Sequence, residues 1–170
     1  MKAYTKNRCN EENDYERLAH QLSVLNQIKE WVILSGGWAW HFMSPPHKEY
    51  KHLHDHKDID IFVEPNNINK VILKLKELGF NRIKTKYDNN TFIRYENIIN
   101  DRKIVIDMFF KEVPSIICNE WKVVEPSYLL SLYDSIHQTK HCVAVIESNK
   151  LIKKGIDPCN KKELINLSIL

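Results

Sequence analysis

Three aspartates stand at positions where they could bind a divalent cation. Asp58 and Asp60 alternate with Ile59 and Ile61, which is the period-two pattern of a β-strand. Alternate residues of a strand project from one face about 6 to 7 Å apart, so both carboxylates can reach a cation above that face. Asp107 lies in an otherwise apolar run, where a carboxylate requires compensation. We predict that the three aspartates bind magnesium, which prefers a few carboxylates and completes its shell with water and phosphate oxygens.

A Ser-Gly-Gly turn is the second feature with chemical potential. Ser35, Gly36 and Gly37 follow a short apolar strand at residues 31–34 and precede a short helix that is expected from Trp38. Glycines let backbone N–H groups approach a phosphate closely, and a helix N-terminus favours an anion. The turn is therefore suited to a bound phosphate group, although a Gly-Gly turn alone is a weak signal.

Other interpretations of the acidic and basic residues stay open at this point. Asp107 taken alone could be the ion-pair partner of Arg94, Arg102 or Lys103. Arg94 and Glu96 share one face of a predicted strand, where they could face an acceptor or form a surface ion pair.

The histidines and tryptophans also allow two interpretations each. An extended segment would align His52, His54 and His56 with Asp58 and Asp60, an arrangement that could attract zinc. The alternative is a hydrated loop in which His56 orients the acid pair through a hydrogen bond. Aromatic residues after the Gly-Gly turn could stack on a base or pack in the core; they are Trp38, Trp40 and Phe42.

Periodicity and turn residues predict the elements that position these side chains. Helices are expected at residues 13–29 and from Asn66 or Asn67, as the capping residue, to Gly79. Residues 44–54 are expected to form an exposed loop. Strands are expected at residues 31–34, 58–63, 80–86, 91–98 and 103–110, the last three as an antiparallel meander. This order predicts an α/β (α+β) fold, with a mixed or antiparallel sheet of about five strands, flanking helices and a helical C-terminal part at residues 126–170.

Length and composition favour one ordinary globular domain. The 170 residues are 43% hydrophobic and 28% charged, and they allow a core without disulfides or a structural metal. The net charge of +3 does not by itself demand a nucleic-acid partner. We expect a cytoplasmic protein with no membrane association, because we find neither a secretory leader nor a membrane span. The four widely spaced cysteines are expected to be free thiols.

The motifs resemble those of the polymerase-beta-type nucleotidyltransferases, and most closely the small enzymes that modify lincosamides and aminoglycosides. Residues 34–39, LSGGWA, look like the Gly-Gly-Trp segment of that group, and residues 56–61, HKDIDI, look like its His, basic, Asp, hydrophobic, Asp motif. Asp107 falls where the family carries its third carboxylate. The resemblance covers residues 31–110, the expected catalytic core, and is weaker beyond.

The resemblance implies an enzyme that transfers a nucleoside monophosphate from a nucleoside triphosphate, most simply ATP, to an acceptor hydroxyl. Two magnesium ions would be held by Asp58, Asp60 and Asp107, and Asp107 is also the candidate general base. A small molecule such as an antibiotic is the favoured acceptor. The alternatives are transfer to RNA, tRNA or a protein side chain, and a nucleotide-binding module without turnover.

Overall fold

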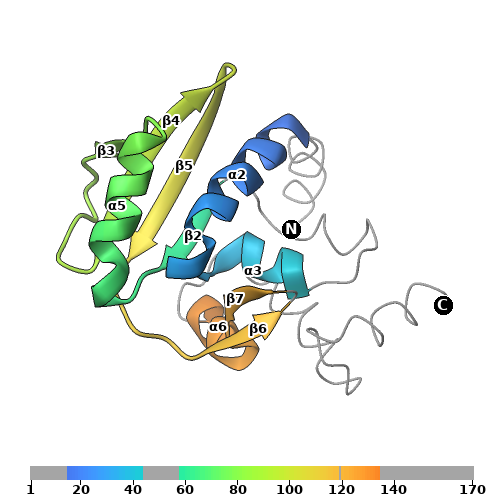
Figure 1. Cartoon of the computed structure of the whole chain (residues 1–170). Coiled ribbons are helices and arrows are strands. Elements are labelled where there is room, and N and C mark those ends of the chain that lie inside the picture. Colours follow the sequence, from blue (N-terminus) through green and yellow to red (C-terminus); the bar gives the residue numbers. More distant parts are fainter. Residues whose placement is uncertain (1–14, 44–57, 119, 135–170) are drawn as a thin grey trace, which may run out of the picture.

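The fold is built around one mixed β-sheet. The computed structural model describes residues 15–43, 58–118 and 120–134. Their seven strands lie in the order β3-β4-β5-β2-β1-β7-β6 (Figure 1). The expectation of an α/β fold with a mixed sheet and flanking helices is therefore confirmed.

The described elements have the following bounds. The helices are α2 (Tyr15–Ile28), α3 (Gly36–Met43), α5 (Ile68–Glu77) and α6 (Pro126–Asp134), with 3-10 turns η1 (Lys29–Trp31) and η2 (Pro65–Asn67). The strands are β1 (Ile33–Leu34), β2 (Ile59–Phe62), β3 (Asn81–Ile83), β4 (Phe92–Ile99), β5 (Arg102–Phe109), β6 (Ser115–Cys118) and β7 (Trp121–Val124).

A tight turn sets the register of the longest hairpin. Strands β3, β4 and β5 form the predicted antiparallel meander. Between β4 and β5 stand Asn100 and Asp101 with φ of 48° and 61°. Positive φ at both central residues is the signature of a type I′ turn, which suits the twist of a two-residue hairpin. The turn therefore pairs residues equally distant from it, Arg94 with Asp107 among them.

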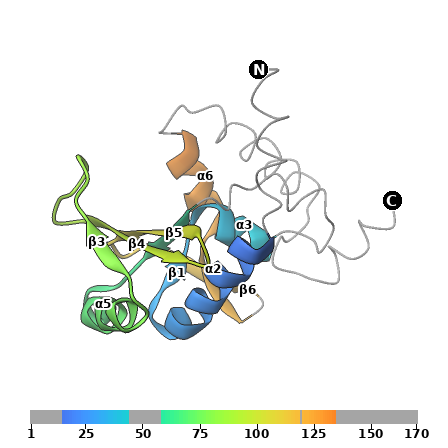
Figure 2. The ribbon, with the colours of Figure 1, turned by 90° about the horizontal axis from the view of Figure 1, so that it is seen from above.

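The two faces of the sheet differ in polarity. On β5, the alternate residues Ile104, Ile106 and Met108 are fully buried, while Lys103 is exposed and Val105 is partly exposed. Helices α2 and α5 cover the apolar face, whereas α6 lies on the other side of the sheet (Figure 2). The side chains of Asp60 and Asp107 alternate with the apolar set, so they project from the opposite face.

The sheet is larger than the predicted five strands. The additional hairpin, β6 and β7, extends the sheet beyond β1, because β7 pairs in parallel with β1 through Leu34 and Val123. Its strands are only four residues long and show no clear alternation of polar and apolar residues. Such short strands are stabilised by sheet pairing more than by a local pattern, which explains why they escaped prediction.

Two helix starts also differ from the prediction. Helix α3 begins at Gly36, two residues before the expected Trp38. Asn67 takes the predicted N-cap position of α5, but its side chain makes no capping hydrogen bond. A 3-10 turn leads into that helix instead, with the Asn67 N–H donating to the Glu64 carbonyl at 2.9 Å. The predicted end is right, since Gly79 has a φ of 83° and follows Leu78, the C-cap residue of the helix.

Several expectations lie outside the described residues. They concern the histidine-rich segment before Asp58, the chain after Asp134, and three of the four cysteines. The fourth, Cys118, is a buried free thiol. Among the described helices, none is long and apolar enough to cross a membrane.

A buried hydrogen bond ties α3 to α2 and so holds the Gly-Gly turn in place. The Trp38 Nε1–H donates to the Gln21 Oε1 at 3.0 Å, and both side chains are buried. Gln21→Leu removes the acceptor and is expected to lower the free energy of unfolding by about 1–3 kcal/mol in urea titrations. Gln27→Leu, at an exposed position of the same helix, is the matched control. Equal stability of the two variants would contradict this role for Gln21.

Candidate active site

One row of paired residues crosses the sheet at the predicted site. The Ser35 N–H, at the end of β1, donates to the Asp60 carbonyl of β2 at 2.9 Å. Asp60 is the register partner of Asp107 on the parallel strand β5, and Asp107 is the partner of Arg94 on the antiparallel strand β4. Register partners on adjacent strands project to the same face. The sheet thus places two of the predicted metal ligands side by side, with an arginine next to them.

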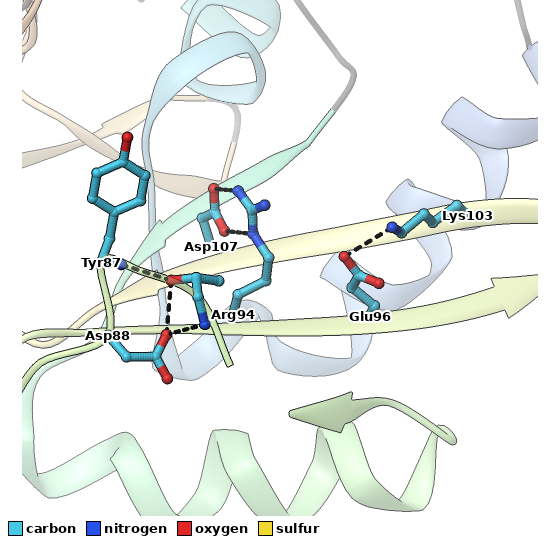
Figure 3. A network of polar contacts seen from close by, with 7 residues as sticks. Tyr87, Asp88, Arg94, Glu96, Lys103 and Asp107 are labelled. Atoms are coloured by element: carbon cyan, nitrogen blue, oxygen red, sulfur yellow. Dashed lines mark hydrogen bonds and ion pairs between the residues drawn. The ribbon is translucent and has the colours of Figure 1, made fainter. Parts of the chain in front are cut away.

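The Arg94 guanidinium forms a two-pronged ion pair with the Asp107 carboxylate. The Arg94 Nε–H donates to Oδ1 at 2.7 Å and the Nη2–H donates to Oδ2 at 2.8 Å, as Figure 3 shows. The hydrogen bond to Asp107 raises the pKa of Arg94 above its ordinary value; burial opposes this, and the charges of Asp107, Asp58 and Glu96 add to it. Arg94 is therefore a permanent cation among acidic side chains.

The structure decides among the three basic residues that could pair with Asp107. Arg102 forms an ion pair with Glu16 at 2.9 Å instead. Lys103 pairs with Glu96 at 3.0 Å, farther along β4 and β5 (Figure 3). Arg94 is the partner of Asp107, an alternative that the sequence left open.

Close packing against Asp60 explains the glycine at position 36. Gly36 has a φ of 55°, and a Cβ atom there would overlap the Asp60 Oδ2 and lie 3.1 Å from its Cγ. The Asp60 carboxylate therefore lies against the first residue of α3. Ser35 and Gly37 are buried on either side of this contact. The N-terminal N–H groups of a helix favour negative charge, so the turn and the carboxylate are electrostatically compatible.

The third predicted ligand, Asp58, lies in the bend that leads into β2. It is near enough to Arg94 for its charge to raise the pKa of that residue. In the part of the chain that the structure describes, no three histidine, cysteine or acidic side chains form a ready-made metal-binding group. Both Asp107 oxygens are held by Arg94. The structure thus gathers the three aspartates around one arginine, and their metal-binding role stays a prediction.

The aromatic residues after the turn belong to the core. Trp38 and Trp40 are almost completely buried. Phe42 stacks on Trp121 of β7, with ring centroids 4.7 Å apart and an interplanar angle of 17°. These contacts favour packing over base stacking as the role of the aromatic cluster.

Comparisons with known proteins identify the fold and not a close relative. No family model and no curated protein matches the sequence. The crystal structure of ANT(2'')-Ia in complex with adenylyl-2''-tobramycin superimposes with a TM-score of 0.53 at 14% identity, covering 79% of this chain and 87% of that one. This chain has a nucleotidyltransferase fold.

Two further structures share the nucleotidyltransferase fold. The solution structure of the antibiotic-resistance factor ANT(2'')-Ia gives a TM-score of 0.52 at 15% identity and covers 89% of this chain and 87% of that one. The Megavirus polyadenylate synthase gives 0.51 at 13% identity, covering 88% of this chain but 36% of that one. The resemblance to polymerase-beta-type nucleotidyltransferases is thus supported at the level of the fold.

Replacing Gly36 tests the contact between the turn and Asp60. Gly36→Ala forces a side chain into the left-handed region, at about 1–2 kcal/mol, and also against a carboxylate. Gly79→Ala is the matched control, because Gly79 also has positive φ but would meet only the Asn97 amide, at 3.2 Å. We expect urea unfolding to show a larger loss of stability for Gly36→Ala. A smaller loss than for Gly79→Ala would contradict the contact.

Proposed function

We propose that this protein transfers a nucleoside monophosphate from a nucleoside triphosphate, with ATP favoured, to a hydroxyl group of a small-molecule acceptor. The acceptor oxygen forms a bond to the α-phosphorus and the bond between that phosphorus and the bridging oxygen to the β-phosphate breaks. Pyrophosphate leaves with the electron pair, and the hydroxyl proton passes to a base on the protein.

The observation that carries the proposal is the side-by-side placement of Asp60 and Asp107 next to the Gly36 turn. The parallel pairing of β2 with β5 makes these two residues register partners, and Gly36 lies against the Asp60 carboxylate. This puts hard oxygen ligands beside a turn that suits phosphate, on a sheet with a nucleotidyltransferase fold.

The chemistry of these side chains fits magnesium. Asp58, in the bend before β2, and Asp60, on β2, would hold the ion, while Asp107 would join them when Arg94 releases one of its oxygens. When bound, magnesium neutralises phosphate charge and lowers the pKa of the attacking hydroxyl.

The protein itself supplies position and charge. Ser35, Gly36 and Gly37 would orient the phosphates through backbone N–H groups at the start of α3. Asp107 is the candidate base, since it lies in the centre of the row and its carboxylate is largely shielded from water. Arg94 would balance the negative charge that the triphosphate adds.

The structural comparisons favour a small acceptor over RNA. This chain spans most of ANT(2'')-Ia, which was solved with adenylyl-2''-tobramycin, but about a third of the polyadenylate synthase. The match thus takes in most of a protein solved with an adenylylated antibiotic and a smaller part of a polyadenylate synthase. By this analogy the protein would be an antibiotic-resistance factor.

Replacing Asp60 tests whether the proposed metal-binding aspartates are needed for activity. Asp60→Asn keeps the shape of the side chain but removes a charged metal ligand. Magnesium-dependent pyrophosphate release should therefore fall by at least about 100-fold, because replacing residues that only support a metal ligand already lowers activity by up to about 100-fold. Asp101→Asn is the control, because Asp101 lies in the β4–β5 turn with positive φ, which asparagine adopts readily. Full activity of Asp60→Asn would refute the proposed site.

The acceptor class is tested with α-phosphate-labelled triphosphate and two kinds of acceptor. We expect label to enter members of an aminoglycoside and lincosamide panel and to be absent from total tRNA, with both products followed by chromatography. Label in RNA alone would replace our acceptor with the RNA alternative. Triphosphate binding without transfer to either would indicate a nucleotide-binding module.

A further inference from the structure

We propose that Arg94 is an internal counter-cation that keeps Asp107 out of metal coordination until a nucleoside triphosphate binds. Metal binding would then follow nucleotide binding at this position. The inference rests on the proposed function, because it assumes that Asp58, Asp60 and Asp107 bind divalent cations. It assigns Arg94 a positioning role that acts through Asp107.

The ion pair competes with a metal for the Asp107 carboxylate. Arg94 donates to both carboxylate oxygens, at 2.7 and 2.8 Å, through two different nitrogens. Such a planar fork occupies one lone pair of each oxygen and places a positive charge beside the carboxylate, which disfavours the approach of a cation.

The charges around Arg94 explain why the fork forms. Register pairing holds Asp60 directly beside Asp107, and two neighbouring carboxylates repel each other unless a cation lies near them. Arg94 stands next in the row and also feels the charges of Asp58 and Glu96. It therefore supplies the positive charge that a metal would otherwise bring.

Arg94 is also the more exposed member of the pair. Its side chain is 33% exposed, whereas the Asp107 side chain is 11% exposed. A guanidinium binds phosphate oxygens with the same two-pronged geometry that it uses for carboxylates. A triphosphate at the Gly36 turn would thus give Arg94 a competing partner, and the release of Asp107 would complete the metal site.

The test is Mn²⁺ binding in the absence of nucleotide, measured by electron paramagnetic resonance. Arg94→Met keeps the length of the side chain but removes the fork, so we expect it to bind Mn²⁺ about tenfold more tightly than the wild type, within the usual range of coupling between sites. Lys103→Met is the matched control. It removes one positive charge from the same strand as Asp107 but breaks an ion pair with Glu96, so its Mn²⁺ affinity should stay near the wild-type value.

Two further measurements separate this role from a purely structural one. With a non-hydrolysable triphosphate analogue, the wild-type affinity for Mn²⁺ should rise toward that of Arg94→Met. Arg94→Lys keeps the charge but not the fork, so it should fold as the wild type does and bind Mn²⁺ with intermediate affinity. Thermal unfolding with and without Mn²⁺ should show a larger stabilisation by the ion for Arg94→Met than for the wild type.

The inference is overturned if Arg94→Met and the wild type bind Mn²⁺ equally without nucleotide, or if Lys103→Met gains as much as Arg94→Met. In either case, Mn²⁺ binding that is lost in Asp60→Asn would leave the proposed function intact. Wild-type protein that binds no Mn²⁺ with or without the triphosphate analogue would instead refute the proposed function, and this inference with it.

Discussion

The parallel pairing of β2 with β5 is the constraint on which the site depends. It makes Asp60 and Asp107 neighbours in one row, where their charges repel. The opposite faces of the same strands bury isoleucines and Met108 in the core, so a shift of register would expose them. The apolar core therefore holds the two carboxylates together, and the Arg94 fork offsets the repulsion.

The second constraint is the contact between the start of α3 and β2. Asp60 can lie against the first turn of that helix only because Gly36 has no side chain. The buried Trp38–Gln21 hydrogen bond links the same helix to α2. The start of α3 is thus held by two separate contacts, Gly36 against the Asp60 side chain and the Trp38 side chain against that of Gln21.

Part of this arrangement was predictable from the sequence. The pairing of Arg94 with Asp107 follows from a two-residue turn at Asn100 and Asp101, because a hairpin pairs residues equally distant from its turn. The placement of Asp107 beside Asp60 was not predictable in this way, since β2 and β5 are separated by α5 and two strands, and their pairing arises from tertiary packing. The short β6–β7 hairpin escaped for the same reason.

The proposed metal and nucleotide site is tested most directly by a crystal structure with Mn²⁺ and a non-hydrolysable nucleoside triphosphate. The anomalous signal of manganese would locate the ion. We expect manganese bound to the Asp58 and Asp60 carboxylates, phosphates at the Gly36 turn, and an Asp107 oxygen released from Arg94. A triphosphate bound away from this row, with the Arg94–Asp107 fork intact and no manganese at the aspartates, would contradict it.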